Sequence, residues 1–100
     1  VAKKQKCRAK IEYRVSGEAF YTEPNNDIIM VKNVVKKVTR LSAKLNCRGG
    51  TSDSRFLGSI PRLELGLRNN SIHQVNERTS VSDLKKLTLI YTNILKNYFK

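Results

Sequence analysis

The residue of this sequence with the clearest chemical potential is His73, the single histidine among 100 residues. An imidazole titrates near neutral pH and binds divalent metals, so it can serve as a metal ligand or as a general acid or base. A zinc site takes three or four protein ligands, so His73 cannot form one alone. Glu64 and Glu77 are the nearest carboxylates, although each also fits a solvated surface. Without further context, a histidine in a polar loop is more often an ordinary surface residue.

A second candidate lies at residues 49–53, which read Gly-Gly-Thr-Ser-Asp. Backbone N–H groups at the start of a helical turn, with hydroxyls beside them, suit a carboxylate or a phosphate. The same residues also make a plain turn. They lack the Gly-Lys-Thr/Ser of a phosphate-binding P-loop and the spacing of a dinucleotide-binding fingerprint. One histidine and scattered serines do not indicate a Ser-His-Asp triad.

The charge balance favours an anionic partner, but its distribution does not. Lysine and arginine number 20 against 8 acidic residues, a formal charge of +12, which suggests nucleic acid or an acidic membrane. The basic residues are nevertheless spread along the chain, with no stripe interleaved with aromatics. A basic nucleic-acid-binding module is therefore the disfavoured alternative. No apolar run approaches the ~20 residues that span a bilayer, so no membrane partner is expected.

The cysteines and the N-terminus indicate a cytoplasmic chain. Cys7 and Cys47 have no metal-ligand spacing. A disulfide between them stays open, but the reduced state is favoured. The basic N-terminus has no hydrophobic segment behind it and so is not a secretory signal. It also lacks an initiator methionine, and a mean hydropathy of −0.48 predicts a thin core, so we expect a piece of a longer chain.

Five elements are expected to position these residues. Residues 9–15 and 62–67 alternate apolar and polar side chains and predict strands, with a hinge at 16–22. Asn25 predicts the start of a helix of roughly five turns ending near Asn46. Thr51 or Ser52 would cap a short turn at 53–57, and Ser80 a helix that runs to the C-terminus. This order favours an α/β fold, although two strands are too few for a stable sheet.

Several motifs carry a specific resemblance when they are taken together. They are Gly-Gly-Thr-Ser-Asp-x-Arg-Phe at 49–56, Glu-Leu-Gly at 64–66, Asn-x-x-Ile-His-x-x-Asn-Glu at 69–77 and Ser-Gly-Glu-Ala-Phe at 16–20. From about residue 9 onward the chain resembles the end of the succinyl-diaminopimelate desuccinylases. These belong to a wider family of zinc amidohydrolases and peptidases with two metal ions.

The resemblance implies an α/β fold and two domains. Residues 1–20 would be the end of a lid and dimerisation domain with its return hinge. Residues 21–100 would be the C-terminal portion of a zinc-peptidase-like catalytic domain. The family is dimeric through the lid, so the parent is expected to be a homodimer. This fragment is expected to self-associate or to swap elements, since open strand edges and apolar patches seek partners.

The resemblance also implies roles for individual residues. His73 would be the last ligand of a two-zinc centre, with cobalt as an alternative in one position, and would point into a pocket walled by the glycine turn. Gly50 and Thr51 would hold a substrate carboxylate, and the amide of Asn69 would contact substrate. Asp53 and Arg55 would support the glycine turn, while Asn76 and Glu77 would brace the histidine loop.

The resemblance implies hydrolysis of N-succinyl-LL-2,6-diaminopimelate to succinate and LL-2,6-diaminopimelate. The family's other metal ligands and its general base lie upstream of the residues present, so no catalytic residue is assigned in this fragment. We therefore expect the fragment alone to be inactive and to bind zinc weakly or not at all. Related acetylornithine deacetylases or peptidases of the same family remain the alternative.

Overall fold

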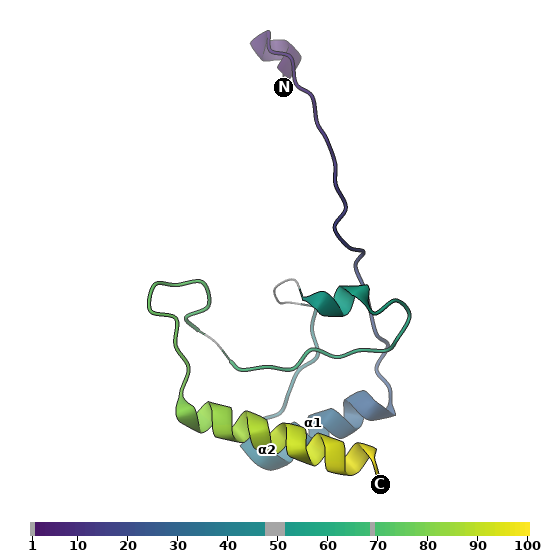
Figure 1. Ribbon diagram of the computed structural model, residues 1–100, viewed down its shortest axis with the longest axis vertical. Coiled ribbons are helices and arrows are strands. Elements are labelled where there is room, and N and C mark those ends of the chain that lie inside the picture. Colours follow the sequence, from purple (N-terminus) through teal and green to yellow (C-terminus); the bar gives the residue numbers. More distant parts are fainter. Residues whose placement is uncertain (1, 48–51, 69) are drawn as a thin grey trace.

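The computed structural model describes residues 2–47, 52–68 and 70–100 (Figure 1). It contains two α-helices, α1 (Asn26–Thr39) and α2 (Val81–Tyr98), and two short 3-10 helices, η1 (Ala2–Gln5) and η2 (Asp53–Phe56). The α-helices pack against each other, while η2 and the loop before α2 are carried on extended segments away from that pair. Among the helices of the described ranges, none has the length and hydropathy needed to cross a bilayer.

Helix α1 begins where the sequence predicts. The side-chain oxygen of Asn25 accepts a hydrogen bond from the backbone N–H of Ile28 at 3.0 Å, which satisfies one of the otherwise unpaired donors of the first turn. Asp27 lies in that turn, and Lys36 and Lys37 lie in the last. Acidic groups at the N-terminus and basic groups at the C-terminus both stabilise the helix dipole.

The predicted end of this helix near Asn46 is wrong, because α1 stops at Thr39. Arg40 adopts a left-handed conformation with φ 62° and donates its backbone N–H to the carbonyl of Lys36. The Thr39 hydroxyl donates to the carbonyl of Val35 at 2.7 Å and accepts from the N–H of Leu41 at 3.1 Å. These bonds end the helix without the glycine that usually follows a helix C-terminus, so the sequence does not mark where α1 ends. Beyond them the chain is extended.

The core is a small cluster at the crossing of α1 and α2. Val34, Val35 and Ile90 are its buried members. Ile28 is also buried. The half-buried side chains packed against the cluster are Met30, Val31, Val38, Ala43, Leu65 and Ile94.

The two predicted strands are not formed, so the α/β class is not seen in this structure. Residues 9–15 and 62–67 are extended, yet within the described ranges no strand pairing occurs. The alternating pattern sets which side chains share a face, but a strand also needs a neighbour for its backbone N–H and C=O groups. Tyr13 is accordingly 86% exposed.

The described chain is expanded for its length. Its radius of gyration is 19.4 Å and its axes measure 64 × 37 × 20 Å, against about 13 Å expected for a compact domain of this size. Large apolar side chains remain exposed, including Ile11, Ile60 and Val75. The helical pair alone does not cover this apolar surface.

Candidate functional site

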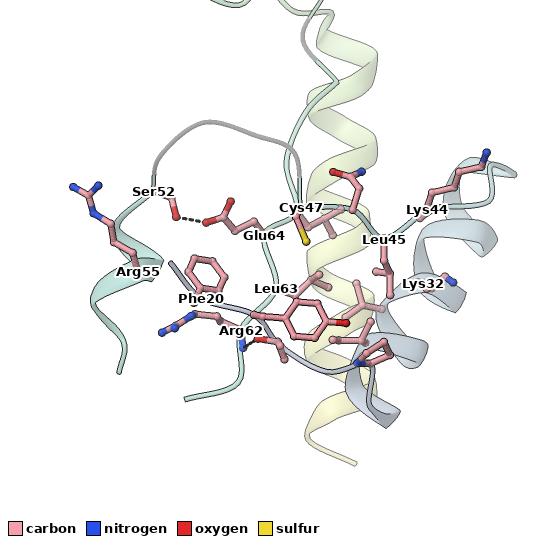
Figure 2. Close-up of a pocket in the computed structure, with 18 of the residues that line it drawn as sticks. Phe20, Lys32, Lys44, Leu45, Cys47, Ser52, Arg55, Arg62, Leu63 and Glu64 are labelled. Atoms are coloured by element: carbon pink, nitrogen blue, oxygen red, sulfur yellow. Dashed lines mark hydrogen bonds between the residues drawn. The ribbon is translucent and has the colours of Figure 1, made fainter. Parts of the chain in front are cut away.

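A hollow of about 750 Å³ lies between α1 and three extended segments. Figure 2 draws most of its lining residues as sticks. Its walls come from residues 17–22 and Pro24, from α1, from residues 43–47, from Ser52 and Arg55, and from residues 62–65. Phe20, Leu45 and Leu63 supply apolar surface, and cationic and hydroxyl groups lie among them. The polar side chains include Lys32, Lys44, Ser52, Arg55, Arg62 and Glu64.

Residues 17–22, part of the predicted hinge, dock on one wall of this hollow. The N–H of Arg62 donates to the hydroxyl of Thr22 at 3.1 Å, and the Arg62 guanidinium lies 4.1 Å from the centroid of the Phe20 ring. A cation over an aromatic face is attracted by the ring's negative face. At Gly17, a Cβ atom would lie 2.7 Å from Cδ of Arg55, so any side chain there would displace that arginine.

Glu64 joins the extended segment 62–65 to the start of η2. Ser52 and Ser54 both donate their hydroxyl protons to Oε1 of this glutamate, and Figure 2 shows Ser52 and Glu64 facing each other. Ser52 is also the N-cap of η2, because its hydroxyl accepts from the N–H of Ser54 at 3.2 Å. The hydrogen bond from Ser52, followed by that from Ser54, lowers the pKa of Glu64, because both stabilise the carboxylate.

His73 lies in a loop, residues 70–78, that is closed by its own hydrogen bonds. Ser71 is buried; its hydroxyl donates to the carbonyl of Arg78 and accepts from the N–H of the same residue, both at 3.0 Å. The N–H of His73 donates to the Glu77 carboxylate at 3.3 Å. His73 and Asn76 adopt left-handed conformations with φ 61° and 64°, which non-glycine residues rarely do.

Of the predicted site residues, the described part of the chain includes His73 alone. His73 is exposed and does not line the hollow, and Figure 1 shows its loop standing apart from η2. Gly50, Thr51 and Asn69 lie outside the described residues. The support predicted from Asp53 and Arg55 concerns a turn that also lies outside them.

The described residues do not fit a complete metal centre. Across residues 2–47, 52–68 and 70–100, no group of three histidine, cysteine, aspartate or glutamate side chains lies close enough to hold an ion. Glu77 is turned onto the backbone of its own loop. Cys7 and Cys47 are both exposed and free. His73 can therefore be at most one ligand of a site completed elsewhere, and weak zinc binding by the chain alone stays a prediction.

Sequence reasoning missed the role of Glu64. The alternation of residues 62–67 places it on the polar face, where a glutamate is normally solvated. Its serine partners lie 10 and 12 residues away, so no local spacing marks the contact. The stacking of Arg62 on Phe20 spans an even longer separation and has no motif either.

The comparison with protein families gives one match, covering nearly the whole chain. The profile of peptidase family M20/M25/M40 matches residues 5–97. No solved structure gives a significant match.

Relatives with established names are similar over most of this chain. It is 54% identical over 100 residues to a succinyl-diaminopimelate desuccinylase of Pelagibacter ubique (strain HTCC1062), an overlap of 99% of this chain and 26% of that protein. Desuccinylases of Rhodopseudomonas palustris (strain HaA2) and Ehrlichia canis (strain Jake) are 42% and 43% identical, over 95% and 85% of this chain and 25% and 23% of theirs. The chain thus spans about a quarter of the length of these relatives. On the family match over residues 5–97, the chain belongs to peptidase family M20/M25/M40.

Proposed function

We propose that this chain is the C-terminal segment of a cytoplasmic, metal-dependent amide hydrolase. The whole enzyme would convert N-succinyl-LL-2,6-diaminopimelate and water to succinate and LL-2,6-diaminopimelate. The observation that carries the proposal is the 54% identity to the Pelagibacter ubique desuccinylase over 99% of the chain. The motifs at 49–56 and 69–77 fall within the residues that the family profile matches.

The proposal assigns this segment binding and positioning roles. His73 would give one ligand to a two-zinc centre, in which cobalt could replace one ion. Gly50 and Thr51 would hold a substrate carboxylate and Asn69 would contact the substrate. Because the described residues offer no complete ligand set, the remaining ligands and the general base must come from outside them. Residues 1–20 would belong to a lid through which the parent forms a homodimer.

The loop around His73 supports a placed imidazole. The hydrogen bonds between Ser71 and Arg78, and the bond from the His73 N–H to Glu77, hold the backbone of His73 in a left-handed conformation. Such a conformation is costly unless the surrounding contacts impose it, and it is frequent at functional sites. The loop can therefore hold the backbone from which the imidazole projects in one conformation.

A chimaera tests the proposal. The matching quarter of the Pelagibacter ubique desuccinylase would be replaced by this chain, and succinate release from N-succinyl-LL-2,6-diaminopimelate would be measured with zinc present. We expect activity within about tenfold of the parent, the small change expected when positioned groups are retained. His73→Ala should lower kcat/KM by roughly a hundredfold or more, because loss of a ligand exceeds loss of a group that only orients one. Val75→Ala is the matched control, since Val75 lies in the same loop and is 91% exposed.

The outcomes separate the candidate functions. Faster hydrolysis of an acetylated than of a succinylated substrate would identify a related deacylase instead. A chimaera that unfolds at the parent's temperature yet hydrolyses neither substrate would contradict the proposal. Equal activity of the His73→Ala and Val75→Ala variants would remove His73 from the metal centre.

A further inference from the structure

We propose that Glu64 is a positioning residue for substrate binding, acting through Ser52 and Ser54. Its carboxylate fixes Ser52, the N-cap residue of η2, which directly follows the predicted Gly50-Thr51 turn in the sequence. This inference rests on the proposed function, which assigns the substrate carboxylate to that turn. Glu64 itself touches no substrate in this account.

The first argument is the geometry at the start of η2. Both serine hydroxyls donate to the same oxygen of Glu64, and the two hydroxyl oxygens lie 2.6 Å apart. Two hydroxyl protons serve three short contacts among Ser52, Ser54 and Glu64, and the Glu64 carboxylate is the member of this group that only accepts. The Ser52 oxygen then keeps its lone pairs for the N–H of Ser54. One carboxylate thus orients the two serines and frees the capping oxygen.

The second argument is that the segment carrying Glu64 is itself anchored. Two residues before it, the N–H of Arg62 is held by the Thr22 hydroxyl. One residue after it, the carbonyl of Leu65 accepts the hydroxyl proton of Tyr91 from α2. Leu65 also packs against the core cluster. Through the anchored segment 62–65, the carboxylate therefore links η2 to the packed pair of helices α1 and α2.

The third argument concerns what such a link does for binding. Besides this link, the side chain of Arg55 in η2 lies against Gly17, in the wall formed by residues 17–22. Groups that hold a ligand must keep their positions within a fraction of an ångström, and supporting hydrogen bonds provide that precision. Loss of the link should weaken substrate binding and raise KM. It should leave kcat nearly unchanged, because the metal ligands and general base lie elsewhere.

The test uses the active chimaera with Glu64→Ala and Glu64→Gln. We expect Glu64→Ala to raise KM at least about tenfold, because two hydrogen bonds to a charged group are lost, with kcat within about threefold of the unmodified chimaera. Glu64→Gln keeps an acceptor without the charge, so its KM should lie between those of the unmodified chimaera and of Glu64→Ala. Ser52→Ala with Ser54→Ala removes the η2 cap as well as both donors and should raise KM at least as much as Glu64→Ala. The triple variant should be no worse than this double variant, because residues in one network are not additive. Glu23→Gln, an exposed glutamate, is the control.

Three results would overturn the inference: a fall in kcat with KM unchanged, fully additive losses in the triple variant, or variants equal to the Glu23→Gln control. If Glu64→Ala does not fold, the KM of Ser54→Ala tests the inference instead, because this variant removes one donor and keeps the Ser52 cap. Inactivity of the unmodified chimaera would count against the proposed function. In that case, amide exchange at Ser54 in the 100-residue chain decides about the link: several-fold faster exchange in Glu64→Gln supports it, and equal exchange refutes it.

Discussion

At the scale of single residues, the Glu64 carboxylate has a property that can be measured without substrate. Its pKa lies below the ordinary 4.5, because Ser52 and then Ser54 donate hydrogen bonds to the charged form. A carboxyl whose pKa is depressed on folding stabilises the folded state above its ordinary pKa. That contribution is lost as pH falls through the lower, folded value. The link to η2 should therefore persist through neutral pH and weaken only in acid.

An NMR titration of the glutamate carboxylates in the 100-residue chain checks this. We expect the Glu64 midpoint to fall below 4.5. The Ser52→Ala/Ser54→Ala variant should return it toward that ordinary value, because the two largest causes of the shift are removed. An identical Glu64 midpoint in the two proteins would show that the serines do not bond to it in solution.

Local contacts were predictable from sequence at this scale, and distant ones were not. The brace between Glu77 and the backbone of His73 joins residues four apart, within one recognisable motif. The Glu64 contacts and the stacking of Arg62 on Phe20 join segments that only the folded chain brings together. Such contacts leave no spacing in the sequence to detect.

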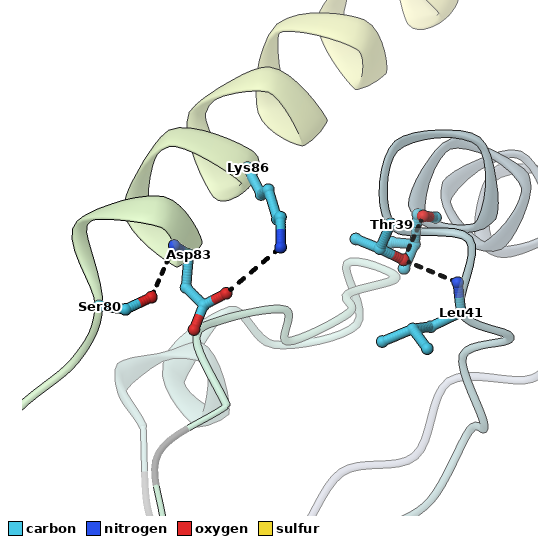
Figure 3. Close-up of polar contacts among 6 residues, drawn as sticks. Thr39, Leu41, Ser80, Asp83 and Lys86 are labelled. Carbon is cyan, nitrogen blue, oxygen red and sulfur yellow. Dashed lines mark hydrogen bonds and ion pairs between the residues drawn. The ribbon is translucent and has the colours of Figure 1, made fainter.

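At the scale of elements, the start of α2 depends on one hydroxyl. Figure 3 shows Ser80 accepting the backbone N–H of Asp83 at 3.0 Å, with the Asp83 carboxylate 3.9 Å from Lys86. In a capping box, the acid three residues after the N-cap would reach back to the N–H of Ser80. Here the Asp83 carboxylate instead forms an ion pair with Lys86 along the helix surface.

Replacement of the cap should fray the first turn of α2. We expect Ser80→Ala to cost about 1 kcal/mol of helix stability, because a backbone donor loses its acceptor. Loss of helical ¹³Cα shifts over residues 81–84 would report it. Ser82→Ala, two residues further along in the same first turn, is the matched control and should change little. Equal shifts in both variants would mean that the hydroxyl of Ser80 does not hold the helix start.

Helix starts were predictable from sequence, whereas the end of α1 and the strands were not. The side chains of Asn25 and Ser80 accept hydrogen bonds from N–H groups three residues away, so the local sequence predicts where each helix begins. The end of α1 depends on a left-handed Arg40 and on Thr39, whose hydroxyl donates to the Val35 carbonyl and accepts from the Leu41 N–H. Figure 3 shows the bond between Thr39 and Leu41. A strand depends on another segment, and the described residues supply none that pairs with 9–15 or 62–67.

At the scale of the whole molecule, exposed apolar surface and high charge act in opposite directions. The exposed apolar side chains favour association, while a charge of +12 on each copy opposes it. Salt screens the repulsion, with a Debye length of about 10 Å at 0.1 M and about 3 Å at 1 M.

We therefore expect self-association of the isolated chain to grow with salt. Sedimentation velocity at rising salt should show a shift from monomer to larger species. X-ray scattering at low salt should give a radius of gyration near 19.4 Å. A monomer at every salt concentration, or a radius near the ~13 Å of a compact domain, would contradict this.

The extended arm before α1 makes the chain vulnerable at one end. A protease binds its substrate as an open strand, and exposed chain termini are cut before packed elements. Arg8, Lys10 and Arg14 are exposed on this arm, whereas Lys36 and Lys37 are held within α1. Brief trypsin digestion should therefore remove the arm first and leave a product that begins near Val15, with both α-helices intact.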